Sequence, residues 1–165
     1  MMTLSESVRE SAEFDRFYSS IKKQCGDSAH AQIAYVPHYA KVKKFLGAGE
    51  EGSVALLSDG RVLKVYYREI PARVHRIAML NERDIVPSAF SRIYEYDNTW
   101  IIREYAEPGT KKCRETYSDI TNHRHTEWTD DFEEQVSKLH LDGDIDLKRD
   151  CLGETQDGRV VLIDW

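Results

Sequence analysis

The sequence predicts an α+β fold built in two layers. An amphipathic helical segment at residues 3–25 opens the chain, and several short β-type runs joined by turn residues follow it. A second clear helix and a closing β-hairpin occupy the last quarter of the sequence. Strands that follow one another through short turns, with a few helices set apart from them, are typical of an α+β fold rather than of alternating βαβ units.

Composition narrows the class of protein further. The chain has 165 residues, 41% of them hydrophobic, and 23 Lys and Arg against 29 Asp and Glu give a net charge of −6. This is a soluble globular composition, and the negative charge argues against a general nucleic-acid-coating role. No apolar run is long enough for a membrane span, and no apolar leader segment opens the sequence. Three scattered cysteines, Cys25, Cys113 and Cys151, indicate a reducing compartment, so we expect a cytoplasmic protein without membrane or nucleic-acid partners.

The N-terminal helix has a start signal, a stop signal and one apolar stripe. Thr3 and Glu6 have the spacing of a capping box, and Gly26 is a suitable stop. The stripe recurs at i, i+3, i+4 and i+7 and consists of Phe14, Phe17, Tyr18 and Ile21. We expect this stripe to pack against the core, with a partner-binding arm as the alternative.

The middle of the chain is predicted to be mostly β. Asp59-Gly60 is a strong hairpin signal, and Pro71 fits the first turn of an inserted helix at residues 69–83. A pair of strands that turns at Asp97-Asn98 follows this helix, and Pro108-Gly109 then breaks the pattern. The predicted strands are residues 31–36, 41–46, 53–57, 62–67, 86–96 and 99–105.

The last part is predicted to hold one helix and one hairpin. Residues 110–127 are polar and weakly patterned, which indicates a loop or a frayed helix. Thr129 is the expected N-cap of the next helix, and Gly143 its end. Two short strands, near Leu152 and at residues 160–163, close the chain around a turn at Asp157-Gly158.

A glycine loop is the first candidate functional feature. Gly47, Gly49 and Gly52, followed by Val54, match the pattern G-x-G-x-x-G-x-V. A dinucleotide-binding fingerprint needs a helix after the glycines, but β-type residues and a hairpin signal follow here. Strand, glycine loop and strand form the arrangement that covers nucleotide phosphates in protein kinases, because glycines let the backbone approach the phosphates closely.

Lys64 is the second candidate. Strand alternation predicts that Val62, Lys64 and Tyr66 share one face, whereas Leu63 and Val65 share the other. The run Val62-Leu63-Lys64-Val65 resembles the kinase strand V-A-I-K, whose lysine pairs with the α- and β-phosphates. A charge that protects an edge strand from aggregation is the alternative explanation of this lysine.

The end of the sequence carries two further motifs. Asp146-Leu147-Lys148 resembles D-L-K of H-R-D-L-K-x-x-N, and Cys151 then falls on the asparagine. Asp164-Trp165 resembles the start of D-F-G and follows Asp146 by 164 − 146 = 18 residues. With four motifs in the correct order over residues 43–165, the chain resembles the protein-kinase-like superfamily, in a minimised form such as phage or effector kinases show.

This resemblance implies a five-stranded antiparallel N-lobe sheet with one helix, and a much reduced helical C-lobe that carries the catalytic-loop hairpin. The implied regions are residues 1–40 as an N-terminal helix and lead-in strand, residues 41–109 as the N-lobe, and residues 110–165 as the reduced C-lobe. The implied cofactors are ATP and Mg²⁺, or Mn²⁺ in its place. The implied substrate is a Ser or Thr of a host or cellular protein.

The resemblance also implies roles for individual residues. Gly47, Gly49 and Gly52 would cover the phosphates, and Lys64 would neutralise their charge. Asp146 would accept or orient the proton of the substrate hydroxyl, Lys148 would stabilise the transferred phosphoryl group, and Asp164 would bind the metal. The adenine would lie between Val54 and Val62, beside a hinge that contains Glu104 and Ala106.

Several positions depart from the family pattern. Cys151 offers a thiol where the second metal ligand belongs, whereas Mg²⁺ prefers oxygen ligands, and Asp150 could substitute for it. Glu69 is a weak candidate for the glutamate that pairs with Lys64. A second register, with Gly143-Asp144 as the G-D pair of aminoglycoside-type phosphotransferases, misplaces the metal positions. The motifs that follow D-F-G are not in the sequence.

Three functions remain open on this basis. The first is ATP-dependent phosphorylation of Ser or Thr in a protein. The second is a catalytically dead pseudokinase that acts as a binding or inhibitory module, which the thiol of Cys151 favours. The third is a small-molecule phosphotransferase. Autophosphorylation near the N-terminus, where serines are plentiful, is an additional expectation.

Overall fold

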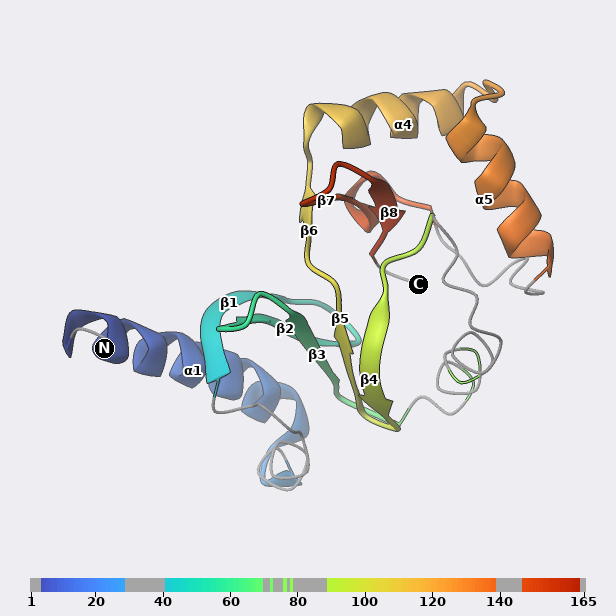
Figure 1. Cartoon of the computed structure of the whole chain (residues 1–165). Helices are drawn as coiled ribbons and strands as arrows, with labels where there is room; N and C mark the ends of the chain where they lie inside the picture. Colours follow the sequence, from blue (N-terminus) through green and yellow to red (C-terminus); the bar gives the residue numbers. More distant parts are fainter. Residues whose placement is uncertain are drawn as a thin grey trace. The chain divides into compact units, whose positions relative to one another are not determined.

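The computed structural model has an α+β fold and describes residues 4–28, 41–69, 72, 76, 78, 89–138 and 147–163 (Figure 1). The chain divides into two compact units. Unit 1 comprises Met1–Arg83 and Ile93–Glu104, and unit 2 comprises Asp84–Arg92 and Tyr105–Trp165. No helix of the described ranges is long and apolar enough to cross a membrane.

Unit 1 contains one long helix, as the apolar stripe predicts, and a five-stranded antiparallel sheet, as the resemblance implies. Helix α1 spans Leu4–Cys25 and packs against the first two strands of the sheet. The strand order is β1-β2-β3-β5-β4, so β3 is the central strand. The strands are β1 (Val42–Ala48), β2 (Gly52–Leu57), β3 (Val62–Tyr66), β4 (Ile93–Asp97) and β5 (Trp100–Arg103).

The core of unit 1 lies between α1 and one face of the sheet. Phe17 and Ile21 of the predicted apolar stripe are fully buried in it, and Phe14 and Tyr18 pack against its border. This confirms the prediction that the stripe packs against the core. The sheet side chains of this core alternate along the strands and are Val42, Ala55, Leu57, Leu63, Val65, Trp100 and Ile102.

A polar contact fixes α1 along the edge strand. The backbone N–H of Phe45 in β1 donates a hydrogen bond of 2.7 Å to Oε2 of Glu13. Arg16, one turn further along α1, forms a 3.0 Å ion pair with Glu13 and lies over the ring of Phe45. An edge strand has backbone groups with no strand beside them, and here a helix side chain satisfies one of them.

Unit 2 contains a three-stranded antiparallel sheet with the order β6-β7-β8. Strand β6 spans Ala106–Pro108, β7 spans Leu152–Thr155 and β8 spans Val160–Leu162. The last two strands confirm the predicted hairpin, in which Thr155 N donates to Arg159 O at 2.9 Å. A short 3₁₀-helix, η2 (Arg149–Cys151), leads into β7.

Two helices complete unit 2, and both correct the sequence-based boundaries. Residues 110–127, expected as a loop or frayed helix, contain the regular helix α4 (Lys111–Thr121), which the hydroxyl of Thr110 caps. Helix α5 spans Glu127–Lys138, so Thr129 lies in its first turn and is not its N-cap. Thr126 N donates to Thr129 Oγ1 at 2.8 Å and Thr129 N to Thr126 Oγ1 at 3.2 Å, a reciprocal pair of the capping-box kind.

The predicted strand at residues 86–96 is also corrected. Strand β4 begins only at Ile93, and the segment before it belongs to unit 2. There, Leu162 N donates to Ala89 O at 2.7 Å and Ser91 N to Leu162 O at 3.0 Å, so this segment runs beside β8. Likewise β5 ends at Arg103, short of the predicted residue 105.

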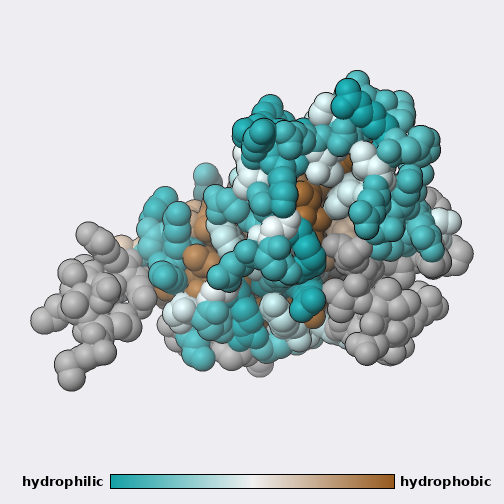
Figure 2. Space-filling model, turned by 45° about the horizontal axis from the view of Figure 1, so that its top comes forward, coloured by the Kyte–Doolittle hydropathy of each residue, from teal (hydrophilic) through white to brown (hydrophobic). Residues whose placement is uncertain are grey.

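Some predicted elements lie outside the described residues. They include the strand at 31–36, the end of α5 at Gly143, and most of the helix at 69–83, of which Ala72, Arg76 and Ala78 are described as helical. On the face in Figure 2, hydrophilic side chains predominate among the described residues, with hydrophobic ones showing between them. The large hydrophobic side chains described as exposed are Leu46 and Tyr94.

Candidate functional site

Lys64 lies on the central strand of the sheet in unit 1. Its backbone is directly opposite Val54 of β2 on one side and Ile101 of β5 on the other. The residue is only 7% exposed. A lysine that protects an edge strand needs an edge position and solvent contact, so that alternative explanation of Lys64 is wrong.

The side chain of Lys64 belongs to the sheet face that is turned away from the hydrophobic core. Leu63 and Val65, its neighbours along β3, are both members of the core beneath α1. Strand alternation places Val62 and Tyr66 on the same face as Lys64. Val54, directly opposite Lys64, shares that face as well, so the two valines expected to enclose an adenine ring lie beside the lysine.

The ammonium group of Lys64 has an acidic and an aromatic neighbour. Nζ lies 3.8 Å from Oε2 of Glu51, a residue of the glycine loop, and 4.9 Å from the ring centre of Tyr66. The sequence pointed instead to Glu69, which is exposed beyond the end of β3. The strand register was the signal that could have revealed Glu51. Because Gly52 pairs with Tyr66, the preceding loop residue comes close to β3.

The glycine loop makes a tight connection between β1 and β2. Its three glycines differ in their backbone conformation and in the space available for a side chain. Gly49 N donates to Gly52 O at 2.9 Å. A Cβ atom on Gly52 would lie 2.4 Å from the carbonyl oxygen of Val65, so only glycine fits there. Gly47 has φ +154°, which side chains disfavour, but a Cβ on Gly49 would meet nothing within 4 Å. Packing therefore explains Gly52, whereas the space beside Gly49 is open.

A chain of hydroxyl groups links this loop to α1. The Ser53 hydroxyl oxygen lies 2.7 Å from that of Ser20 and 2.9 Å from that of Tyr67. Ser20 also lies 2.6 Å from the carbonyl oxygen of Phe17. Tyr67 N in turn donates to Glu51 O at 2.9 Å. The end of the glycine loop is thus held to both α1 and the residue that follows β3, a connection that the sequence analysis missed.

Arg103 is a second buried cation on the Lys64 face. It lies directly opposite Val62 in the register of β3 and β5 and is 9% exposed. Glu104 follows it as the last residue of unit 1, and Ala106 is a buried residue at the start of β6 in unit 2. The predicted hinge therefore coincides with one of the positions at which the chain passes from one unit to the other.

Apart from Lys64, which lies in unit 1, the predicted catalytic and metal-binding residues belong to unit 2. Asp146 and Asp164 lie outside the described residues. Lys148 is exposed and precedes η2, and its carbonyl oxygen accepts a hydrogen bond of 3.0 Å from Cys151 N. The Cys151 carbonyl oxygen accepts one of 2.7 Å from Ile163 N. The backbone thus brings Cys151 beside the residue that directly precedes Asp164.

The described residues do not assemble a metal site. Among them, no group of three His, Cys, Asp or Glu side chains could hold a metal ion. The Cys151 thiol is buried, 7% exposed, and sulfur is a poor ligand for Mg²⁺. The part of the site that the structure describes therefore does not fit a second Mg²⁺ at Cys151.

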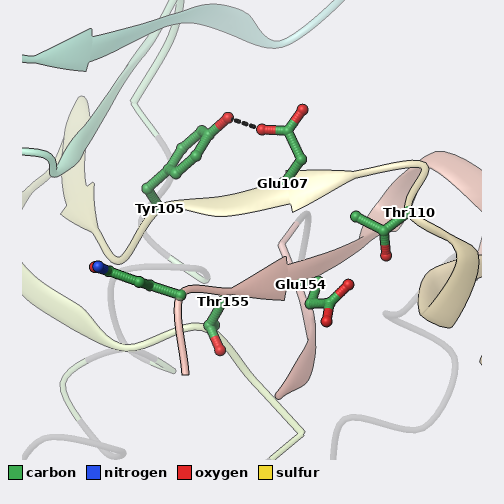
Figure 3. A pocket seen from close by; sticks show the side chains of 6 residues that line it. Tyr105, Glu107, Thr110, Glu154 and Thr155 are labelled. Atoms are coloured by element: carbon green, nitrogen blue, oxygen red, sulfur yellow. Dashed lines mark hydrogen bonds between the residues drawn. The ribbon is translucent and has the colours of Figure 1, made fainter. Parts of the chain in front are cut away.

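Unit 2 has a pocket of about 420 Å³ that the sequence analysis did not anticipate (Figure 3). The Tyr105 hydroxyl donates a hydrogen bond to the Glu107 carboxylate. This bond raises the pKa of Tyr105 to about 12, because ionisation would break it and place two negative charges together. Tyr105, the middle residue of the predicted hinge, lines this pocket, and the other predicted site residues that the structure describes do not. Its lining is Tyr105, Glu107, Thr110, Glu154, Thr155 and Gln156.

Comparison with known proteins assigns no family to this arrangement. The chain matches no protein-family sequence model, and its sequence matches no curated protein.

Proposed function

We propose that this chain binds ATP beneath the loop at residues 47–52 and transfers the γ-phosphoryl group to a Ser or Thr of a protein. The observation that carries this proposal is the position of Lys64. Its ammonium group lies on the central strand, on the sheet face opposite the hydrophobic core, close to a glycine loop. In protein kinases, a lysine on the third strand and a glycine-rich loop before it hold the nucleotide phosphates.

Electrostatics supports an anionic ligand at this lysine. Burying an ammonium group costs several kcal/mol unless anions or hydrogen-bond acceptors surround it. Lys64 is 7% exposed, whereas its carboxylate partner Glu51 has a side chain that is 55% exposed. The α- and β-phosphates of a nucleotide would add negative charge at this buried ammonium.

The glycine loop fits a phosphate group for a separate reason. No atom of the described chain would contact a Cβ on Gly49, and its backbone has no conformation that requires glycine. A ligand that approaches the backbone closely at Gly49 would account for a glycine that packing does not explain. Val54 and Val62, on the same face as Lys64, would provide apolar contacts for the adenine ring.

The proposed reaction is a direct displacement at phosphorus. The substrate hydroxyl oxygen attacks the γ-phosphorus, the bond from that phosphorus to the bridging oxygen breaks, and ADP leaves with the electron pair. Asp146 takes the hydroxyl proton, and Lys148 offsets the negative charge of the transferred group. A Mg²⁺ held by Asp164 would neutralise phosphate charge when bound. These assignments rest on the sequence motifs, and the close approach of Cys151 and Ile163 supports placing the two motifs together.

The test is label transfer from γ-labelled ATP in the presence of Mg²⁺ or Mn²⁺, with the protein alone and with a bacterial lysate. The informative variants are Lys64→Met, which keeps the volume of the side chain and removes its charge, and Asp146→Asn. The matched control is Lys43→Met, because Lys43 is an exposed lysine on β1 of the same sheet. We expect label with the native protein and the control, and a loss of at least about a hundredfold in the other two variants.

The same experiment separates the alternative functions. ATP binding without label in any lane favours a pseudokinase that acts as a binding module, which the buried Cys151 thiol would explain. Label that passes only to small molecules of the lysate favours a small-molecule phosphotransferase. Absence of ATP binding in the native protein contradicts the proposed function.

A further inference from the structure

We propose that Glu51 is a specificity-determining residue, which makes the Lys64 site favour a metal-complexed polyphosphate over a bare one. This inference rests on the proposed function, because it concerns the same anion site. It goes beyond that function because it assigns to the Glu51 carboxylate a role in selecting ligands by their negative charge.

The geometry places Glu51 where the ligand's phosphates are proposed to lie. Its Oε2 is 3.8 Å from Nζ of Lys64, so the carboxylate stands beside the cation that phosphates would contact. The backbone of Glu51 is fixed, because its carbonyl oxygen accepts a hydrogen bond of 2.9 Å from Tyr67 N. The side chain is 55% exposed and has room to turn toward solvent. A ligand can displace the carboxylate from Lys64, but it cannot move the loop residue far away.

Charge then discriminates between ligands. The repulsion between a carboxylate and an anion grows in proportion to the charge of the anion and falls with distance. A bare triphosphate carries two more negative charges than its complex with one divalent cation. Glu51 therefore opposes the bare anion more strongly than the complex, whatever the position of the cation. This selection needs no metal ligand from the chain itself.

Glu50 provides a matched control within the same loop. It is the neighbouring glutamate and is also exposed, but the ion pair with Lys64 belongs to Glu51. The variants Glu51→Gln and Glu50→Gln each remove one negative charge, keep the shape of the side chain and change the net charge of the protein equally. A difference in triphosphate affinity between the two variants therefore depends on where the negative charge lies and not on the net charge of the protein.

The experiment is calorimetric titration of the full chain with inorganic triphosphate, with and without Mg²⁺. For bare triphosphate, Glu51→Gln is expected to tighten binding about three- to tenfold, and Glu50→Gln less than about twofold. For the Mg²⁺ complex, the gain from Glu51→Gln should be clearly smaller. Equal gains for both ligands, or weaker binding by Glu51→Gln, would overturn the inference.

Hydrogen exchange of the loop amides in the ligand-free protein gives an independent readout. If Glu51 holds the loop to Lys64, exchange at residues 47–52 is faster in Glu51→Gln than in Glu50→Gln. If neither the native protein nor either variant binds triphosphate or ATP, both the proposed function and the selectivity are overturned. Faster exchange in Glu51→Gln would then identify the ion pair with Lys64 as purely structural. Binding by the native protein without the selective gain overturns the inference alone.

Discussion

Ser20 of α1 and Ser53 of β2 hold their hydroxyl oxygens 2.7 Å apart, directly after the last glycine of the loop. Each hydroxyl has one proton, and the carbonyl oxygen of Phe17, 2.6 Å from Ser20, can only accept. Ser20 can donate its proton to the Ser53 hydroxyl oxygen or to the Phe17 carbonyl oxygen, and in the contact between Ser53 and Tyr67 either hydroxyl can be the donor. The N-terminal helix is therefore tied to the glycine loop by a continuous polar connection across an otherwise apolar core.

Ser53→Ala should destabilise unit 1 by about 1–3 kcal/mol, because it removes the hydroxyl that contacts both Ser20 and Tyr67 in a site where Ser53 is fully buried. Urea unfolding followed by circular dichroism measures this change. Ser58→Ala, an exposed serine in the turn after β2, is the control and should change stability by less than about 0.5 kcal/mol. Equal stabilities of the two variants would contradict the hydrogen-bonded chain.

Alanine substitutions at two glycines of the loop should have different effects, one on stability and the other on ligand binding. Gly52→Ala places a methyl group 2.4 Å from the Val65 carbonyl oxygen, so it should destabilise the protein by about 2–4 kcal/mol. Gly49→Ala meets no atom within 4 Å and should change stability by less than about 0.5 kcal/mol. If phosphates approach Gly49, the same variant should weaken ATP binding about tenfold in calorimetry. Unchanged affinity in Gly49→Ala would remove the support that the open space gives to a phosphate site.

The elements of unit 1 were predictable because their signals are local. The apolar stripe of α1 and the alternation along β3 are properties of short windows, and they placed Phe17, Ile21 and Leu63 correctly in the core. Alternation also placed Lys64 on the other face. It could not tell whether β3 was an edge or a central strand, because the pairing of β3 with β5 joins residues almost forty positions apart.

The parts that sequence reasoning missed depend on such distant contacts. The segment before β4 was predicted as part of that strand, but its Phe90 pairs with Leu162 instead. No residue close to Phe90 in the sequence indicates this pairing. The predicted start of α5 was wrong because Thr126 and Thr129 are equally suitable N-cap residues by type. The hydrogen bonds between the two threonines became visible only in the structure. In the candidate site, Glu51 became visible only through the register of β2 and β3, since its spacing from Lys64 follows no familiar motif.

The contact between Glu13 and β1 predicts a pH dependence of stability. The backbone N–H of Phe45 lowers the pKa of Glu13; burial opposes this effect, and the guanidinium of Arg16 adds to it. A carboxylate whose pKa is lower in the folded state contributes stability above its ordinary pKa of 4.5, and that contribution is lost as pH falls through the folded pKa. The native protein should therefore lose stability relative to Glu13→Gln below pH 4.5.

At pH 7, Glu13→Gln should be about 0.5–1.5 kcal/mol less stable than the native protein, because an amide oxygen accepts the Phe45 hydrogen bond less strongly than a carboxylate. Free energies of unfolding in urea at pH 7 and at pH 3 measure the two differences. Asp15→Asn is the control, since Asp15 is exposed on the same helix. A stability gap between the native protein and Glu13→Gln that stays constant between the two pH values would contradict the role assigned to the charge.

Trp128 supports unit 2 in two separable ways. Its Nε1–H donates a hydrogen bond of 2.7 Å to the Val160 carbonyl oxygen of β8, and its ring stacks on Phe132 at a centroid distance of 5.1 Å. Phe132 in turn stacks on Phe90 at 5.9 Å, beside the segment that pairs with β8. The hydrogen bond of Trp128 and the stacked rings thus both fix helix α5 to the small sheet.

Trp128→Phe removes the hydrogen bond but keeps an aromatic ring, so it should cost about 1–2 kcal/mol of unfolding free energy. Trp128→Ala also removes the stacking and the buried ring area, and should cost about 3–4 kcal/mol. Urea unfolding monitored by circular dichroism distinguishes the two, with Trp128→Phe lying between the native protein and Trp128→Ala. Equal losses in both variants would mean that the hydrogen bond to Val160, and not the aromatic column, holds α5 on the sheet.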